Sequence, residues 1–159
     1  MEEAAIIKKA QEGNRYCLNT LLEDNYRMLY GFMLKLTGDE ELAKDLTQDA
    51  MVKAVVNIGQ FKGNAKFSTW MTRIAINCFK NHTRKKRISW LPLRDDMIST
   101  QSVEASVEVR DQLNRVNRYL EGVKAMDRLI FVLKHYEGYS YDEISEMTGQ
   151  RIGTCKSKM

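Results

Sequence analysis

The sequence is poor in the residues that interrupt helices or cross-link a chain. It has a single proline and nine glycines in 159 residues, which leaves little room for the many strands and tight turns of an all-β fold. Its three cysteines, Cys17, Cys78 and Cys155, include no CxxC spacing, and there are only two histidines. Neither a disulfide framework nor a zinc site is therefore expected, and we predict buried or half-buried free thiols in a reducing compartment.

Long apolar runs are also missing. No segment approaches the ~20 apolar residues that a membrane span requires, and residues 1–10 mix acidic and basic side chains where a signal peptide would be apolar. The sequence thus predicts a cytoplasmic protein without membrane insertion. Hydrophobic residues still make up 43% of the chain, enough for a packed core. The formal net charge of +4 is too modest to indicate nucleic acid by itself.

Apolar residues at helical spacing dominate the first half of the chain. Asn14 and Asp39 each precede such a pattern and are suited to cap a helix. Gly59 to Lys66 breaks the pattern and is interpreted as a loop. The helices predicted here cover residues 2–12, 14–37, 39–55 and 68 or 69 to about 87.

The periodicity fails between Ile88 and Ser106, a stretch that holds the only proline. We interpret it as a flexible linker between two small domains, residues 1–87 and 107–159. In the second domain, apolar spacing over 109–120 and 129–133 predicts two helices.

A capping box, Ser140 with Glu143, then opens a short helix, and Gly149 separates it from another that begins near Ile152. This second short helix would turn Ile152, Cys155 and Met159 to one face. Helix, glycine-containing turn and helix indicate a helix-turn-helix, so the fold class is all-α.

A basic row lies on the helix after residue 68. Arg73, Asn77, Lys80 and Arg84 follow one another at steps of four, three and four residues, so they share one face. Such side chains bond phosphates and base edges, and Phe61 and Phe67 in and beside the preceding loop could stack on unpaired bases. The alternatives are an ordinary solvated face and aromatic residues that are plain core.

Two further surfaces are candidates for binding. Polar side chains of the last helix point outward as in a recognition helix in the major groove, although a helical hairpin of no particular function would look similar. Asp45, Gln48 and Asp49 form an acidic face that suits a basic protein partner. A small helical enzyme with Asp45 and Asp49 as acids is the alternative, but the sequence offers no pocket of convergent groups for it.

Three segments, in this order, resemble the extracytoplasmic-function (ECF, group IV) sigma factors. They are DEELAKDLTQDAMVKAV (39–55), FKGNAKFSTWMTRIAINCFKNHTRKKR (61–87) and HYEGYSYDEISEMTGQRIGTCKSK (135–158). The resemblance implies a non-enzymatic protein that binds core RNA polymerase and directs promoter-specific initiation through the minus-ten and minus-thirty-five elements. Sigma region 2 would be residues 1–87, and sigma region 4 residues 107–159. No cofactor, metal or catalytic residue is implied.

The resemblance also assigns residues to partners. The polymerase-binding residues, facing the clamp helices of the largest subunit, would be Asp39, Asp45, Gln48 and Asp49. Minus-ten DNA would be bound by Phe61, Lys62, Gly63, Asn64, Lys66, Phe67, Thr69, Trp70, Arg73, Asn77, Lys80, Asn81 and Arg84. Minus-thirty-five DNA would be bound by Ser140, Tyr141, Arg151, Thr154, Lys156, Ser157 and Lys158.

Further implied partners are the polymerase flap and an anti-sigma factor. The chain ends at Met159, inside the recognition helix, where the family continues for a few more turns, and we expect weakened minus-thirty-five binding as a result. The alternative function is a stand-alone helix-turn-helix regulator, which would dimerise because one short recognition helix binds weakly.

Overall fold

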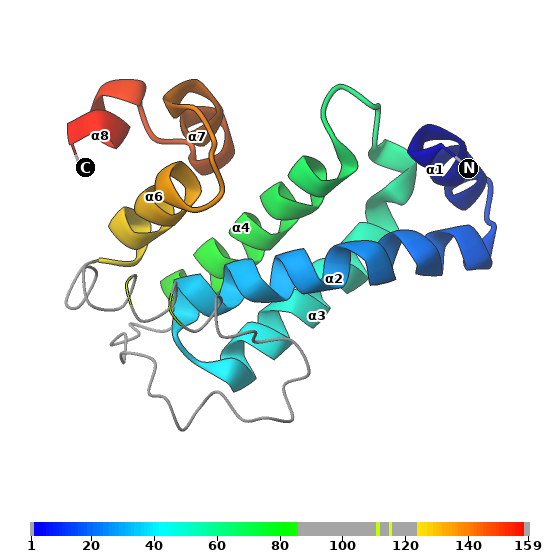
Figure 1. Cartoon of the computed structure of the whole chain (residues 1–159), viewed down its shortest axis with the longest axis horizontal. Helices are drawn as coiled ribbons and strands as arrows, with labels where there is room; N and C mark the ends of the chain where they lie inside the picture. The colour runs from blue at the N-terminus through cyan, green and yellow to red at the C-terminus, as the bar shows by residue number, and fades with distance from the viewer. Residues whose placement is uncertain (1, 86–110, 112–114, 116–123, 158–159) are drawn as a thin grey trace. The chain divides into compact units, whose positions relative to one another are not determined.

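The computed structural model of the chain describes residues 2–85, 111, 115 and 124–157. Within these ranges the regular structure is helical, as predicted, and none of the helices is long and apolar enough to cross a membrane. Asp111 and Arg115 are helical, whereas the predicted linker 88–106 lies outside the described residues. The elements are α1 (Glu3–Gln11), α2 (Arg15–Thr37), α3 (Glu40–Asn57), the 3-10 turn η1 (Ile58–Gln60), α4 (Phe67–Lys85), α6 (Ala125–His135), α7 (Tyr141–Thr148) and α8 (Ile152–Ser157) (Figure 1).

The chain divides into two compact units. The first comprises residues 1–33 and 44–82, and the second comprises residues 34–43 and 83–159. The domain limits expected from the sequence, 1–87 and 107–159, stay a prediction.

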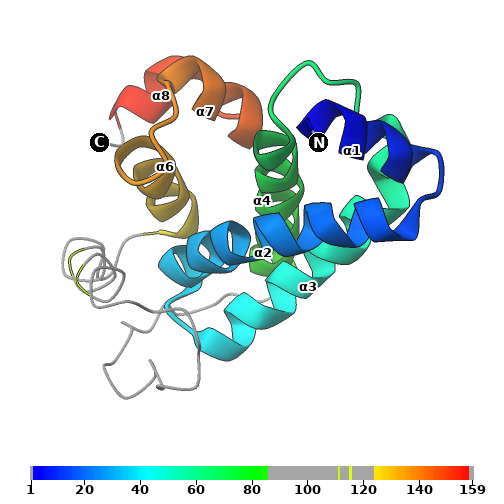
Figure 2. The same ribbon diagram turned by 45° about the vertical axis from the view of Figure 1, so that its right-hand side comes forward.

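In the first unit, α2, α3 and α4 bury their apolar faces in one core. In two views α2 runs alongside α3 and α4 crosses α2, while α1 lies beside η1 (Figures 1 and 2). The apolar face of α4 is broad, because Met71, Thr72, Ala75, Ile76 and Phe79 are all buried. A helix packed against two neighbours needs such a wide face.

The predicted helix starts are confirmed by their caps. The Asn14 side chain accepts a hydrogen bond from the Cys17 amide at 3.0 Å, after a turn in which Gly13 has φ +97°. Asp39 accepts from the Leu42 amide at 3.2 Å. Each carboxylate or amide oxygen satisfies a backbone N–H that the first helical turn would otherwise leave unpaired.

In the second unit, α6, α7 and α8 surround a small apolar centre. Leu129, Ile130, Val132 and Leu133 of α6 are fully buried, as is Cys155 of α8. Ile152, which was predicted to share one face with Cys155, is 39% exposed, whereas Cys155 is fully buried. Ile152 is the first residue of α8 and lies at the edge of the contact.

A buried arginine in the second unit was not expected from the sequence. Arg128 is 2% exposed, and its Nε donates to the Lys35 carbonyl at 2.9 Å. Burial lowers the pKa of Arg128 to about 10. Lys35 in turn pairs with Glu137 at 3.2 Å. These contacts join the last turn of α2 to α6 and to the turn after α6, across more than ninety residues of sequence.

The capping box of α7 is present as predicted. The Ser140 hydroxyl accepts from the Glu143 amide at 3.2 Å, and the Ser140 amide donates to the Glu143 carboxylate at 2.8 Å. Gly149, with φ +76°, ends the helix in the left-handed conformation.

Ser140→Ala should lower the free energy of unfolding of the second unit by about 1 kcal/mol, because the Glu143 amide loses its acceptor. Urea unfolding followed by circular dichroism measures the change. Ser157→Ala, at an exposed hydroxyl near the end of α8, is the control. Equal stability of the two variants would contradict the capping role.

All three cysteines are free and buried, which confirms the prediction of buried free thiols. Burial raises the pKa of Cys78, an effect that Lys53 partly offsets. A protonated, shielded thiol reacts slowly, so Cys78 acts as a small apolar core residue.

Candidate nucleic-acid interface

Three aromatic rings hold both ends of the loop between η1 and α4. The ring centroids of Phe61, Phe67 and Trp70 lie 5.4 Å apart in each pair, and Phe61 meets Phe67 edge to face. Phe67 is 1% exposed and is therefore core, whereas Phe61 and Trp70 are half-buried. α4 begins at Phe67, just before the predicted start.

The loop and α4 form a pocket of about 180 Å³, here named the α4 pocket. Predicted DNA-binding residues from the loop and from the helix meet in it, though they are up to twelve positions apart in the sequence. Its lining consists of Gln60, Phe61, Lys62, Asn64, Ala65, Trp70 and Arg73. Gly63 bends the loop with φ +76°, a conformation that other residues rarely adopt.

The basic row continues from this pocket along α4. Asn77 and Arg84 are exposed, Arg73 and Lys80 are half-buried, and Asn81, which flanks the row, is also exposed. Thr69 is half-buried in the first turn, and Lys66 is exposed just before the helix. The structure thus places aromatic, amide and cationic groups along one helix and its preceding loop.

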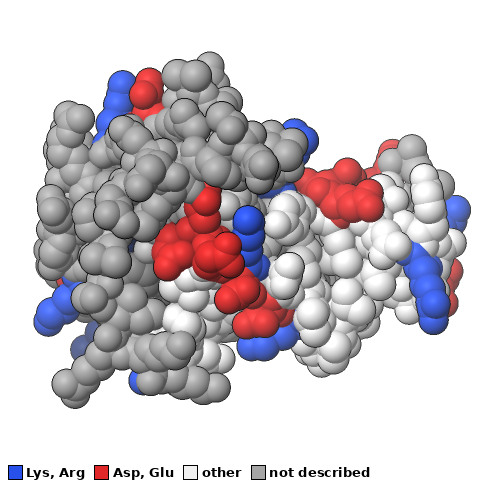
Figure 3. Space-filling view, turned by 90° about the horizontal axis from the view of Figure 1, so that it is seen from below, with Lys and Arg blue, Asp and Glu red and all other residues white. Residues whose placement is uncertain are grey.

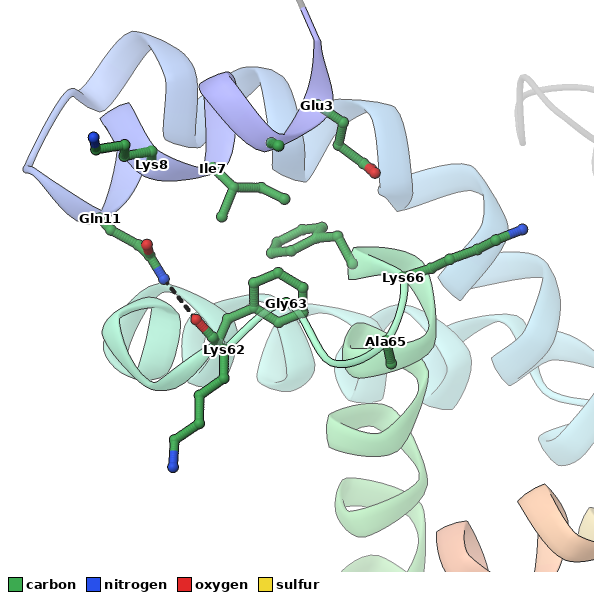
Figure 4. Close-up of a pocket in the computed structure, with 11 residues that line it drawn as sticks. Glu3, Ile7, Lys8, Gln11, Lys62, Gly63, Ala65 and Lys66 are labelled. Atoms are coloured by element: carbon green, nitrogen blue, oxygen red, sulfur yellow. Dashed lines mark hydrogen bonds between the residues drawn. The ribbon is translucent and has the colours of Figure 1, made fainter.

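A second pocket, on the α1 side of the loop, was missed by the sequence analysis. It measures about 330 Å³ and lies between α1 and residues 61–67 (Figure 4). The Gln11 side chain donates to two backbone carbonyls, those of Ile58 at 3.0 Å and Phe61 at 2.8 Å. We name it the α1 pocket. No local pattern could have revealed it, because these contacts span about fifty residues of sequence.

The predicted acidic face on α3 is exposed and extends further than expected. Asp45, Gln48 and Asp49 are exposed, and Val52 and Val56 follow Gln48 at steps of four residues. These two valines are 63% and 76% exposed. Seen from below, acidic side chains gather next to uncharged surface (Figure 3). Exposed apolar residues beside a polar group are typical of a protein-binding surface.

Asp39 differs from the other residues of the expected polymerase-binding set. It is exposed, but its carboxylate already accepts from the Leu42 amide as the cap of α3. Its structural role is sufficient to explain an aspartate at this position.

The helix-turn-helix presents a basic surface at α8. Arg151, Lys156 and Ser157 are exposed and Thr154 is half-buried, while Lys158 lies outside the described residues. The Tyr141 ring lies 4.3 Å from the Lys134 ammonium and 5.8 Å from that of Lys156. Tyr141 thus brings two cations together, whereas the Ser140 hydroxyl is occupied by its cap.

Comparisons with known proteins match both parts of the chain to one family. The Sigma-70 region 2 model matches residues 21–88, and the Sigma-70 region 4 model matches residues 113–159. The ECF RNA polymerase sigma factor SigM of Mycobacterium tuberculosis strain Erdman is 30% identical over 150 residues, which cover 92% of this chain and 73% of the relative. The chain is an ECF sigma factor.

Other relatives agree with this assignment. The RNA polymerase sigma-H factor of Pseudomonas aeruginosa is 25% identical over 171 aligned positions, covering 99% of this chain and 88% of that protein. The solved structure of CnrH in complex with the cytosolic domain of CnrY has the same fold, with a TM-score of 0.66 at 20% identity, over 98% of this chain and 88% of that one.

As an ECF sigma factor, the protein directs promoter-specific transcription initiation by RNA polymerase. The region 2 match contains α3, the loop and the whole of α4, and the region 4 match contains α6 to α8. The region 2 match begins at residue 21, so α1 and the Gln11 side chain lie outside that match. Among the residues that the structure describes, no group of His, Cys, Asp and Glu side chains could hold a metal ion.

Proposed function

We propose that the α4 pocket of this sigma factor holds one base flipped out of the non-template strand of the minus-ten element. The single observation that carries the proposal is that Phe61, Asn64, Trp70 and Arg73 line one small pocket. The rings offer faces for stacking, the amide offers a donor and an acceptor, and the guanidinium offers charge for a phosphate.

The free-energy cost of flipping a base out of the duplex is similar to what the pocket can return. Extruding a base from the duplex costs a few kcal/mol, and stacking on aromatic side chains returns about 1–3 kcal/mol per base. Hydrogen bonds from Asn64 to a base edge would supply the remainder and the discrimination. Asn77, Lys80 and Arg84 would contact the adjacent DNA along α4.

The acidic face of α3 and the basic surface of α8 would bind the other partners needed for initiation. The acidic face of α3, with Val52 and Val56, would bind the clamp helices of the largest polymerase subunit. The basic surface of α8 and Tyr141 would read the minus-thirty-five element, near the polymerase flap. The polymerase would carry out all the chemistry in the cytoplasm, so the sigma factor itself would not be an enzyme.

An anti-sigma factor is a further proposed partner. The RpoE sigma factor of Bartonella quintana was solved in complex with the anti-sigma factor NepR, and it shares this fold with a TM-score of 0.63 at 22% identity over 89% of this chain and 88% of that one. The exposed valines of α3 are available to such a regulator when the polymerase is absent.

Asn64→Ala should change which minus-ten bases the holoenzyme prefers, at a cost of about 1–3 kcal/mol for the correct base. Lys80→Ala should instead weaken all sequences alike and lower the salt dependence by about one counterion. Open-complex formation on promoters varied at each minus-ten position measures both effects.

Asn19→Ala, an exposed asparagine on α2, is the matched control and should leave the profile unchanged. If Asn64→Ala and Asn77→Ala also leave it unchanged, the pocket does not read a base. Promoter choice would then have to come from the helix-turn-helix.

A further inference from the structure

The loop between Phe61 and Phe67 has a pocket on each side. Phe61, Lys62 and Ala65 line both the α4 pocket and the α1 pocket. A strand that enters one pocket therefore passes next to the other. The α1 pocket is the larger of the two, at about 330 Å³, which is within the range of small-molecule sites.

The α1 pocket has apolar side chains at its base and lysines at its rim. Its lining includes Ile7 and Phe67, which are 8% and 1% exposed. Lys8, Lys62 and Lys66 line its edge and are exposed; Figure 4 shows their side chains extending away from the hollow, while Ile7 points into it. An apolar floor does not suit a phosphate, but it suits a base, and lysines around it suit the phosphates on either side.

One acidic side chain adds selectivity to this arrangement. Glu3, in the first turn of α1, lines the same pocket and is exposed. A carboxylate accepts hydrogen bonds and donates none at neutral pH, so it favours a base with an exocyclic amino group. Cytosine, adenine and guanine carry such a group on the edge used for pairing, and thymine does not.

Gln11 keeps the pocket formed. Helices at the ends of a chain fray unless they are tied down. Here the Gln11 side chain donates to two carbonyls at the start of the loop, and Ile7 and Ala10 are buried against the rest of the unit. α1 is thereby fixed to the loop that makes the α4 pocket, so the two pockets keep one spacing.

We propose that the α1 pocket binds a second unpaired base of the strand held by the loop, with a preference for a base that carries an exocyclic amino group over thymine. This inference rests on the proposed minus-ten function of the loop and adds α1 to the recognition surface. Gln11 is a positioning residue for it, since its side chain contacts backbone and not the base.

The test fills the pocket from the outside. Ala4 lines the pocket and is exposed, whereas the neighbouring Ala5 is exposed and does not line it. Holoenzyme with Ala4→Trp or Ala5→Trp is titrated with single-stranded minus-ten oligonucleotides in which each base in turn is replaced by an abasic site. Circular dichroism and core-polymerase binding confirm that both variants fold.

We expect one position at which removing the base weakens oligonucleotide binding by the wild type and by Ala5→Trp about tenfold. Ala4→Trp should bind the intact oligonucleotide about tenfold more weakly than the wild type does, and removing this base should not weaken its binding further. At that position Glu3→Gln should reduce the preference for a base with an exocyclic amino group over thymine, and Glu2→Gln, which is outside the pocket, should not.

Two results would overturn the inference. One is that Ala4→Trp binds every oligonucleotide as Ala5→Trp does; the other is that it weakens all of them equally, abasic sites included. Failure of the proposed function is a different outcome, because then no position depends on Asn64. If one position depends on Asn64 but the Ala4→Trp and Ala5→Trp variants bind every oligonucleotide alike, only the role of the α1 pocket is rejected.

Discussion

Replacing Phe67 with alanine should lower the free energy of unfolding of the first unit by about 3–5 kcal/mol. The ring is 1% exposed and contacts both Phe61 and Trp70 at centroid distances of 5.4 Å. Its removal leaves a cavity beneath the loop and ends both aromatic contacts. Urea unfolding followed by circular dichroism measures the loss.

Tyr16→Ala is the matched control for Phe67→Ala. Tyr16 is also aromatic, but it is 80% exposed, so its loss should change stability by no more than about 0.5 kcal/mol. A loss below about 1 kcal/mol for Phe67→Ala would show that the loop collapses into the space and that the ring is not the support of the two pockets.

The helix ends were predictable from the sequence because their signals are local. Asn14, Asp39 and the pair Ser140 and Glu143 each cap a helix within three residues of their own position. A contact between residues three positions apart can be recognised in the sequence alone, and only a few residue types have side chains that can cap a helix.

The features that the sequence did not reveal depend on distant contacts. Gln11 reaches Phe61 across fifty residues, and Arg128 reaches Lys35 across ninety-three. Glutamine and arginine on a helix are ordinarily solvent-exposed, so the residue type alone predicts an exposed Arg128, whereas the side chain is buried. The α1 pocket therefore had no sequence signal. In the α4 pocket, by contrast, all lining residues except Gln60 and Ala65 were in the predicted set, and they lie close together in the chain.

The exposed valines of α3 were missed for another reason. α3 has apolar residues on more than one side, since Ala50 and Ala54 are fully buried while Val52 and Val56 are exposed. A periodic pattern identifies an inward face only when the other faces are polar. The structure separates the two sets and shows that Val52 and Val56 continue the exposed face begun by Asp45 and Asp49.

Reversing both charges on this face, in Asp45→Lys with Asp49→Lys, should weaken binding of core polymerase by about a hundredfold or more. Truncating one partner of a buried charge pair costs about 2–5 kcal/mol at an interface, and reversal adds repulsion to that loss. Both positions are exposed within α3, so helicity and stability should change little. Titration of labelled sigma factor with core enzyme measures the affinity.

The control is the double variant Glu23→Lys with Asp24→Lys, which makes the same change of charge on the exposed surface of α2. If both double variants bind core polymerase equally, the acidic face of α3 is only a solvated surface. Val56→Ser then separates the two parts of the face. A loss of binding in Val56→Ser but not in the charge reversal would place the contact on the valines, since burial of apolar surface does not depend on the sign of neighbouring charges.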